Sequence, residues 1–194
     1  MNKSIDFYFD FISPYSYIAH KKLLEIRNKL GLNVNYKPIF LGGLHKLEGI
    51  TAPFFFKSKA KFMIKDCKMI TKKLNYKFIF NSHFPINSLH LMRGILVLDK
   101  KNKQIYINKI FNNYWAEGLD LSDRDILDSA LLTINVDIDS FNKNAKQQKI
   151  KDKLKKLTHE AYEKGIFGAP SFVVNNKIFW GQDRLEFVME EYNK

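Results

Sequence analysis

The chain has 194 residues, 45% of them hydrophobic, which is enough to bury a substantial core in one domain or in one domain with an insertion. It contains no apolar run of about 18 residues, and its first residues do not have the basic and apolar segments of a secretory signal. We therefore expect a cytoplasmic protein with no membrane partner. The single cysteine, Cys67, cannot form an internal disulfide, and its lysine-rich, helical surroundings predict a buried or idle thiol.

The net charge of +12 comes mainly from 28 lysines, with only 4 arginines. Proteins that read nucleic acids rely on arginine for its bidentate geometry, and the sequence has no zinc-ligand or RNA-binding signature. We therefore expect no nucleic-acid partner. The charge would instead help to attract anionic substrates.

The first expected elements are a strand over residues 5–12, rich in aromatic and β-branched side chains, and a helix that begins after Ser13. Ser13 is a good N-cap, and Pro14 suits the first helical position because its missing N–H is not needed there. Such a terminus favours anions, since free N–H groups and the positive end of the helix dipole meet there. The alternative is an ordinary Ser-Pro helix start without a ligand.

The pattern after this helix predicts a parallel β-α-β unit. Apolar residues recur at helical spacing up to Gly31, which is expected to close the helix, and residues 33–40 then alternate as a half-buried strand does. The two glycines in residues 41–44 predict a flexible exit from the strand. Residues 53–59 predict an irregular loop rich in phenylalanine.

Helical patterns with few strand signals occupy residues 59–148. In the first of them we expect Phe62, Met63, Cys67, Ile70 and Leu74 to share one face. Further helices are expected over residues 86–98, 105–115 and 122–132, the last with Ser122 as N-cap and Asp125 in a position that resembles a capping box.

The last part of the chain predicts a basic helix over residues 150–162, ended by Gly165, and then two short strands at 167–174 and 177–180. Asn175-Asn176 between the strands suits a hairpin turn. A final helix is expected over residues 186–192.

This order of elements is that of an α/β protein with a thioredoxin-like fold and an inserted all-helical domain. We assign residues 1–42 and 149–194 to a discontinuous thioredoxin-like domain and residues 43–148 to the helical insertion.

Five motifs carry a family resemblance that extends over nearly the whole chain. They are Phe9-Asp-Phe-Ile-Ser-Pro-Tyr-Ser-Tyr17, Phe40-Leu-Gly-Gly43, His83-Phe-Pro-Ile-Asn87, Gly165-Ile-Phe-Gly-Ala-Pro170 and Phe179-Trp-Gly-Gln-Asp-Arg184. Together they resemble the 2-hydroxychromene-2-carboxylate isomerases. These are glutathione-dependent enzymes related to kappa-class glutathione transferases and, more distantly, to DsbA oxidoreductases. Any one motif would be weak, but five in the same order are a strong signal.

The resemblance implies a catalytic, glutathione-binding role for Ser13. Oxidoreductases of this fold carry Cys-x-x-Cys at the helix start, whereas this chain has Ser13-Pro-Tyr-Ser16. A hydroxyl cannot exchange disulfides, so dithiol chemistry is excluded at this position. The hydroxyl can instead donate to an anionic glutathione sulfur, and the helix terminus adds a positive field.

The resemblance also implies further glutathione contacts near the C-terminus. Pro170 matches the family proline that follows a cis peptide bond, and the backbone of Ala169 before it would pair with the cysteinyl part of glutathione. Gln182 and Asp183 match positions that hold the γ-glutamyl end, where a carboxylate suits the ammonium group. The alternatives are a proline that starts an edge strand and an ordinary helix start capped by Asp183. Arg184 either touches the ligand or forms a surface ion pair.

Two lysines, Lys46 and Lys59, match basic family positions near the carboxylate of substrate or glutathione. With so many lysines one match is expected by chance, and Lys46 is the preferred candidate. The family has Asn where this chain has Ile50, which puts the substrate contact there in doubt. Asn87 would contribute to the pocket or cap a helix.

His45 and His83 flank these loops, but neither has metal-ligand spacing with another histidine or a cysteine. Packing or solvent-exposed roles are therefore favoured over acid–base chemistry, and no metal is expected.

The resulting prediction is an enzyme, a glutathione-dependent isomerase of 2-hydroxychromene-2-carboxylate-like aromatic 2-oxo acids. Its partners would be glutathione and a small aromatic substrate, and related proteins suggest a homodimer. The alternatives are a kappa-like glutathione transferase and a non-enzymatic module that binds thiols or peptides.

Overall fold

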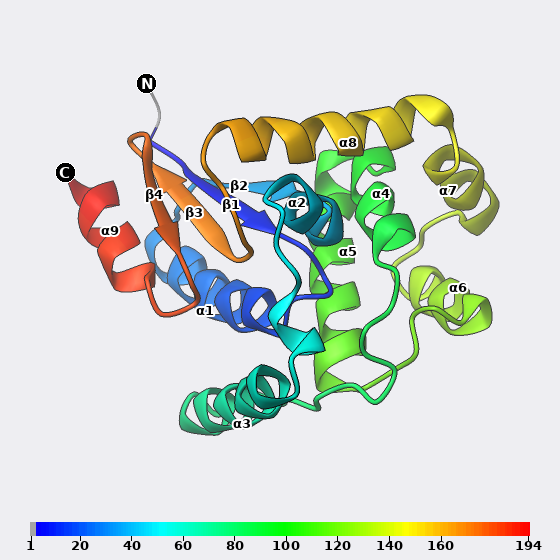
Figure 1. Ribbon diagram of the computed structural model, residues 1–194. Helices are drawn as coiled ribbons and strands as arrows, with labels where there is room; N and C mark the ends of the chain where they lie inside the picture. The colour runs from blue at the N-terminus through cyan, green and yellow to red at the C-terminus, as the bar shows by residue number, and fades with distance from the viewer. Residues whose placement is uncertain (1–2) are drawn as a thin grey trace.

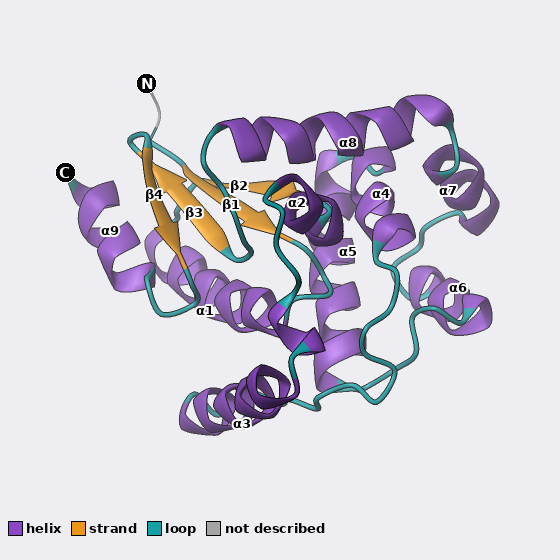
Figure 2. Cartoon of the chain, viewed as in Figure 1, coloured by secondary structure: helices purple, strands orange, loops and turns teal. Residues whose placement is uncertain are grey.

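A computed structural model describes residues 3–194 and contains a four-stranded mixed sheet with strand order β2-β1-β3-β4 (Figures 1 and 2). The strands are β1 (Ile5–Phe9), β2 (Val34–Pro38), β3 (Ser171–Val174) and β4 (Lys177–Trp180). β1 pairs in parallel with β2 and antiparallel with β3, and β3 pairs antiparallel with β4. The thioredoxin-like α/β fold predicted from the sequence is confirmed.

Helices surround the sheet and, with the loops that join them, form the remainder of the described chain (Figure 2). They are α1 (Pro14–Leu30), α2 (Leu41–Leu47), α3 (Lys57–Lys73), α4 (Leu89–Val97), α5 (Lys100–Phe111), α6 (Arg124–Leu132), α7 (Ile138–Ala145), α8 (Gln148–Glu163) and α9 (Leu185–Asn193), with a 3₁₀ turn η1 (Pro53–Phe55) and a π-helical turn η2 (Asn112–Ala116). In Figure 1, α8 runs along the top of the molecule and α3 lies at its lower edge.

α1 begins and ends as the local sequence predicts. The Ser13 side chain accepts a hydrogen bond from the Ser16 N–H at 3.1 Å, and Pro14 occupies the first helical position. At the other end Gly31 adopts φ 64°, and its N–H donates to the carbonyl oxygen of Arg27 at 2.8 Å. Both ends therefore depend on local sequence chemistry.

The two faces of the sheet bury different sets of side chains because residues alternate along β1. Phe7 and Phe9 face α1 and α9, and the Phe7 ring lies 5.2 Å from that of Phe172 on β3. Tyr8 faces the other way and packs with residues of α2 and α8, among them Leu44 and Ala161.

The helical segment shares its core with the sheet. The rings of Phe11 and Phe111 lie 4.9 Å apart, and the Trp115 indole N–H donates to the Phe11 carbonyl oxygen at 2.8 Å. Every described strand lies within residues 1–42 and 149–194, as the proposed division requires, but the boundary at residue 42 falls inside α2. The division into two domains therefore stays a prediction.

Residues 41–44 do not form the flexible exit that their glycines predicted, since they belong to α2. A Cβ atom on Gly42 or Gly43 would stand 3.1 or 2.9 Å from the Phe40 ring. The glycines therefore let this ring lie close to the helix, and the α2 N-terminus is held by a hydrogen bond from Leu41 N–H to the buried Asp10 carboxylate. Tertiary contacts thus outweigh the low helix propensity of glycine.

Two further expectations in the helical segment are wrong. Asp123 rather than Ser122 is the N-cap of α6, because its carboxylate accepts from the backbone N–H groups of Asp125 and Ile126 while the Ser122 hydroxyl donates to Asp120. Phe62 does not share the buried face of α3: it is 67% exposed, whereas Cys67 is buried. Phe62 and Cys67 are five positions apart, and because each residue turns the helix by about 100°, their side chains point in very different directions around it. The sequence also did not predict α7 as a separate helix.

Candidate active site

A cleft of about 820 Å³ opens at the N-terminus of α1. Its walls come from the β1–α1 turn, α2, the segment from Ile50 through the first turns of α3, residues 84–88, and residues 167–169 together with Trp180. Most of the lining side chains are apolar, and among the polar ones are Ser13, His45, Lys59, Asn87 and Ser88. The cleft therefore suits a flat apolar molecule with few polar groups.

Ser13 lines the cleft and is 5% exposed. Its hydroxyl donates to the carbonyl oxygen of Ala169 at 2.9 Å. The peptide bond between Ala169 and Pro170 is cis, as the sequence predicted. Residues far apart in sequence thus meet at the helix start.

Two backbone N–H groups next to Ser13 are free to bind a ligand. Ala169 N–H makes no hydrogen bond within residues 3–194, and Tyr15 N–H is one of the donors that a helix start leaves unpaired. Both residues line the cleft. These donors and the positive end of the α1 dipole favour an anion beside the Ser13 hydroxyl.

Asp10 is a buried carboxylate behind the cleft to which the sequence analysis assigned no role. Its Oδ2 accepts from Leu41 N–H at 2.8 Å and from the Ser88 hydroxyl at 3.0 Å, and its Oδ1 accepts from Ile12 N–H at 3.1 Å. Complete burial raises the pKa of Asp10 to about 6, although these hydrogen bonds favour the charged form.

The three partners of Asp10 all line the cleft, and they come from the β1–α1 turn, the α2 N-terminus and the residue before α4. One side chain therefore connects three walls. The sequence contained one usable signal. Asp10 follows directly after the aromatic end of β1, and a charged residue that is buried there must find hydrogen-bond partners.

The two candidate lysines lie in different places. Lys59 lines the cleft, and its Nζ is 4.9 Å from the centre of the Phe56 ring. Lys46 is exposed on α2 and does not line it. Asn87 and Ile50 do line the cleft, so the structure brings Lys59 and not the preferred Lys46 to the substrate-sized space.

Gln182, Asp183 and Arg184 lie in the turn between β4 and α9, outside the cleft lining. The Gln182 amide oxygen accepts from Lys22 Nζ of α1 at 2.9 Å. The Asp183 carboxylate forms an ion pair with Arg184 at 3.1 Å, and both side chains are about half exposed. This turn therefore runs beside α1, whose N-terminus carries Ser13.

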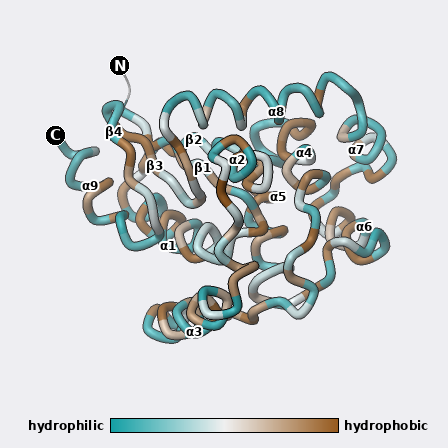
Figure 3. Tube along the Cα trace, viewed as in Figure 1, coloured by the Kyte–Doolittle hydropathy of each residue, from teal (hydrophilic) through white to brown (hydrophobic). Residues whose placement is uncertain are grey.

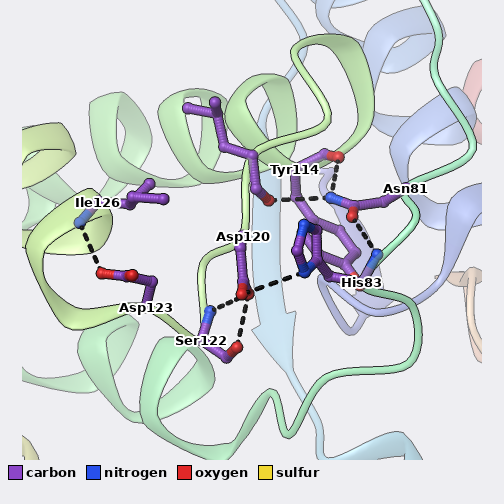
Figure 4. A network of polar contacts seen from close by, with 8 residues as sticks. Asn81, His83, Tyr114, Asp120, Ser122, Asp123 and Ile126 are labelled. Carbon is purple, nitrogen blue, oxygen red and sulfur yellow. Dashed lines mark hydrogen bonds and ion pairs between the residues drawn. The ribbon is translucent and has the colours of Figure 1, made fainter.

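A hydrogen-bonded network fixes the loop that carries residues 84–88 (Figure 4). The buried Asn81 amide donates to the carbonyl oxygens of Tyr114 and Leu119, both at 2.9 Å, and its oxygen accepts from His83 N–H at 2.8 Å. His83 Nδ1 lies 3.2 Å from the Asp120 carboxylate. The other histidine that the sequence analysis considered, His45, lines the cleft, and burial lowers its pKa. His83, in contrast, is held by this network and does not line the cleft.

Cys67 is buried, as expected, and burial raises the pKa of its thiol to about 12, which leaves it protonated and unreactive. Residues 3–194 contain no group of three or more His, Cys, Asp or Glu side chains arranged to hold a metal ion. None of the described helices is long and apolar enough to cross a membrane.

Comparison with known proteins agrees with this fold. Residues 4–193 match the DSBA-like thioredoxin domain family, and the chain belongs to this family. It is 29% identical to a 2-hydroxychromene-2-carboxylate isomerase of Sphingobium xenophagum, over 99% of this chain and 98% of the relative. It is 26% identical to glutathione S-transferase kappa 1 of Caenorhabditis elegans, over 96% of this chain and 89% of the relative.

A solved 2-hydroxychromene-2-carboxylate isomerase superimposes with a TM-score of 0.89 at 24% identity, over 96% of this chain and 92% of that one. The similarity to the isomerases and the kappa transferases that the sequence motifs predicted is confirmed over the whole chain.

Proposed function

We propose that the protein is a glutathione-dependent isomerase of 2-hydroxychromene-2-carboxylate-like aromatic 2-oxo acids. The observation that carries this proposal is the position of Ser13, which caps the N-terminus of α1 and lines an apolar cleft. Isomerases of that name match the chain over nearly its whole length. An enzyme of this class would act in the cytoplasm, and related proteins suggest a homodimer.

The residues at the α1 N-terminus fit a bound glutathione. The Ser13 hydroxyl would donate to the sulfur, and the unpaired Ala169 N–H would pair with the cysteinyl backbone as an added strand does. The turn of Gln182 and Asp183 offers a carboxylate for the γ-glutamyl ammonium group. Asp183 would then exchange its present partner Arg184 for the ligand.

When bound, glutathione would supply a thiolate that adds reversibly to the conjugated double bond of the substrate, so that the bond becomes single, rotates, and forms again as the sulfur leaves. Ser13 would orient that sulfur and lower the pKa of its thiol. To do so, the hydroxyl must turn away from the Ala169 carbonyl oxygen.

The rest of the cleft would bind and orient the substrate. Phe54, Phe84 and Trp180 offer apolar walls that exclude water from the reacting bond. Lys59 would attract the substrate carboxylate, since this positively charged residue lines the cleft.

The second candidate is a kappa-like glutathione transferase, favoured by the similarity to kappa relatives. It would use the same thiolate but release a product that keeps the sulfur. A thiol- or peptide-binding module without turnover is the third candidate.

The deciding experiment follows the isomerisation of 2-hydroxychromene-2-carboxylate by absorbance with and without glutathione, and analyses the products for sulfur by mass spectrometry. Sulfur-free product formed only in the presence of glutathione supports the isomerase. A sulfur-containing product points to the transferase, and binding of glutathione without turnover of any electrophile points to the binding module.

A further inference from the structure

Four large apolar side chains are exposed on η1, on the residue between η1 and α3, and on the outer side of α3. They are Phe55, Phe56, Phe62 and Met69, which we call the α3 patch, and each is between 47% and 70% exposed. Exposed apolar side chains that occur singly are ordinary, but a group on one element marks a contact surface. Figure 1 shows α3 at the periphery of the molecule.

The patch lies on the side of α3 that faces away from the core. Phe62 and Met69 are two helical turns apart and so project from one face, while Cys67 and Thr71 are buried on the opposite face. The tube in Figure 3 alternates between apolar and hydrophilic positions along this helix. This outer apolar line is therefore separate from the side chains that hold α3 in place.

Lysines border the line on both sides. α3 carries seven lysines, all exposed, and at 100° per residue Lys65 and Lys73 fall on either side of Phe62 and Met69. The single acidic residue of the helix, Asp66, accepts a hydrogen bond from the Tyr15 hydroxyl at 2.8 Å. The outer face thus combines apolar side chains and positive charge.

α8 provides a useful contrast, because it is also rich in lysine. Ile150 and Leu154 of α8 are buried in the core, and its exposed large apolar side chain is Tyr162, at 37%. Its outer face therefore does not carry a comparable apolar line. High lysine content is therefore general in this chain, but its combination with exposed phenylalanine and methionine belongs to α3.

We propose that the α3 patch docks on a lipid surface that contains anionic headgroups. A helix with apolar side chains in the middle of its outer face and lysines on both sides matches the boundary between acyl chains and anionic headgroups. A second copy related by two-fold symmetry would bring two lysine-rich faces of the same positive charge together, which disfavours that occupant. The sequence predicted no membrane partner because it has no apolar run long enough to span a membrane. The exposure of Phe62, which a surface contact needs, is known only from the tertiary structure.

The position of the patch relates it to the cleft, since Phe55 and Phe62 also line the cleft. A docked molecule would hold these two lining residues, and with them one side of the cleft through which substrate enters, against the lipid boundary. This consequence for substrate entry rests on the proposed function, whereas the docking itself does not.

The test is flotation of the full chain with phosphatidylcholine vesicles that contain or lack one third phosphatidylglycerol. We expect binding to the anionic vesicles that weakens as salt is added. The triple variant Lys65→Gln, Lys68→Gln, Lys72→Gln should bind on the order of 100-fold more weakly, because each lysine near the surface contributes a factor of about five. Met69→Ser should weaken binding several-fold without any change in charge.

The matched control is Lys149→Gln, Lys153→Gln, Lys155→Gln on α8, which removes the same charge from an exposed face without an apolar line. It should retain most of the binding. Equal loss in both triple variants, or no binding of the unmodified chain to anionic vesicles, would overturn the proposal. Light scattering tests whether a second copy is the occupant instead. If the unmodified chain is a dimer and Phe62→Ser dissociates it, the patch is a dimer contact and the proposal is overturned.

Discussion

The Ser13 hydroxyl and the Ala169 carbonyl oxygen lie 2.9 Å apart, which joins the start of α1 to the residue before the cis proline. The same hydroxyl oxygen accepts from Ser16 N–H, so it caps the helix while its proton points to Ala169. A ligand sulfur at this position would compete only for the proton. Ser13 can therefore keep its capping role and serve a bound thiolate as well.

Ser13→Ala should separate these two roles. Loss of one preorganised donor costs on the order of 100-fold in rate, so turnover at neutral pH should fall by about this factor. Part of the activity should return at higher pH, because a free thiol with a pKa of about 8.5 then ionises without help. Loss of the cap should cost about 1 kcal/mol of stability.

The measurement for Ser13 is the ultraviolet absorbance of the bound thiolate titrated against pH. The control is Ser58→Ala, which removes an exposed hydroxyl from another wall of the cleft. Coincident titration curves for wild type and Ser13→Ala would contradict the proposed role.

Asp183→Asn tests the γ-glutamyl contact. A hydrogen bond to a charged group is worth roughly 1.5 to 3 kcal/mol, so glutathione affinity measured by calorimetry should fall about tenfold to a hundredfold. Glu186→Gln removes an exposed carboxylate only three residues away and should leave the affinity unchanged. Equal affinity in all three proteins would reject the assignment.

Lys59→Gln and Lys46→Gln form a matched pair for the carboxylate of the substrate. Because only Lys59 lines the cleft, its replacement should raise KM on the order of tenfold, as loss of a charge-assisted contact does. Lys46→Gln changes the net charge equally and should have little effect in steady-state kinetics. The reverse result would restore the preference for Lys46 that the sequence suggested.

Asp10 should make stability depend on pH. Burial raises its pKa from 3.8 to about 6 in the folded protein, so the fold binds this proton more tightly than the unfolded chain does. The resulting contribution to the free energy of unfolding is complete below about pH 4 and is lost as the pH rises through about 6. Two pH units correspond to about 3 kcal/mol.

The variant Asp10→Asn lacks this titration. Between pH 4 and pH 7 the wild type should therefore lose about 3 kcal/mol of unfolding free energy relative to the variant. Urea unfolding at several pH values measures it. Parallel pH profiles would show that the Asp10 pKa is not raised.

The same variant should also affect the cleft. Because Asn cannot accept all three hydrogen bonds that Asp10 accepts, the walls of the cleft should loosen and KM should rise.

Features governed by neighbouring residues were predicted from the sequence. Ser13 and Gly31 end α1 as cap chemistry requires, and Asn175 and Asn176 adopt the positive φ of a hairpin turn, 48° and 62°. The thioredoxin-like order of elements followed from alternating hydrophobic patterns, and the motifs identified the relatives.

Features governed by distant residues were known only from the tertiary structure. Gly42 and Gly43 suggested a flexible segment from the sequence. In the structure they lie in α2, where the Phe40 ring lies close to both glycines and the Asp10 carboxylate accepts from Leu41 N–H. Nothing in the local sequence shows which of two lysines reaches the cleft, because that depends on how α2 and α3 pack. The sequence by itself determined the elements and the chemistry at the start of α1. Tertiary packing decided which side chains surround Ser13, since burial and long-range hydrogen bonds exist only once the chain has folded.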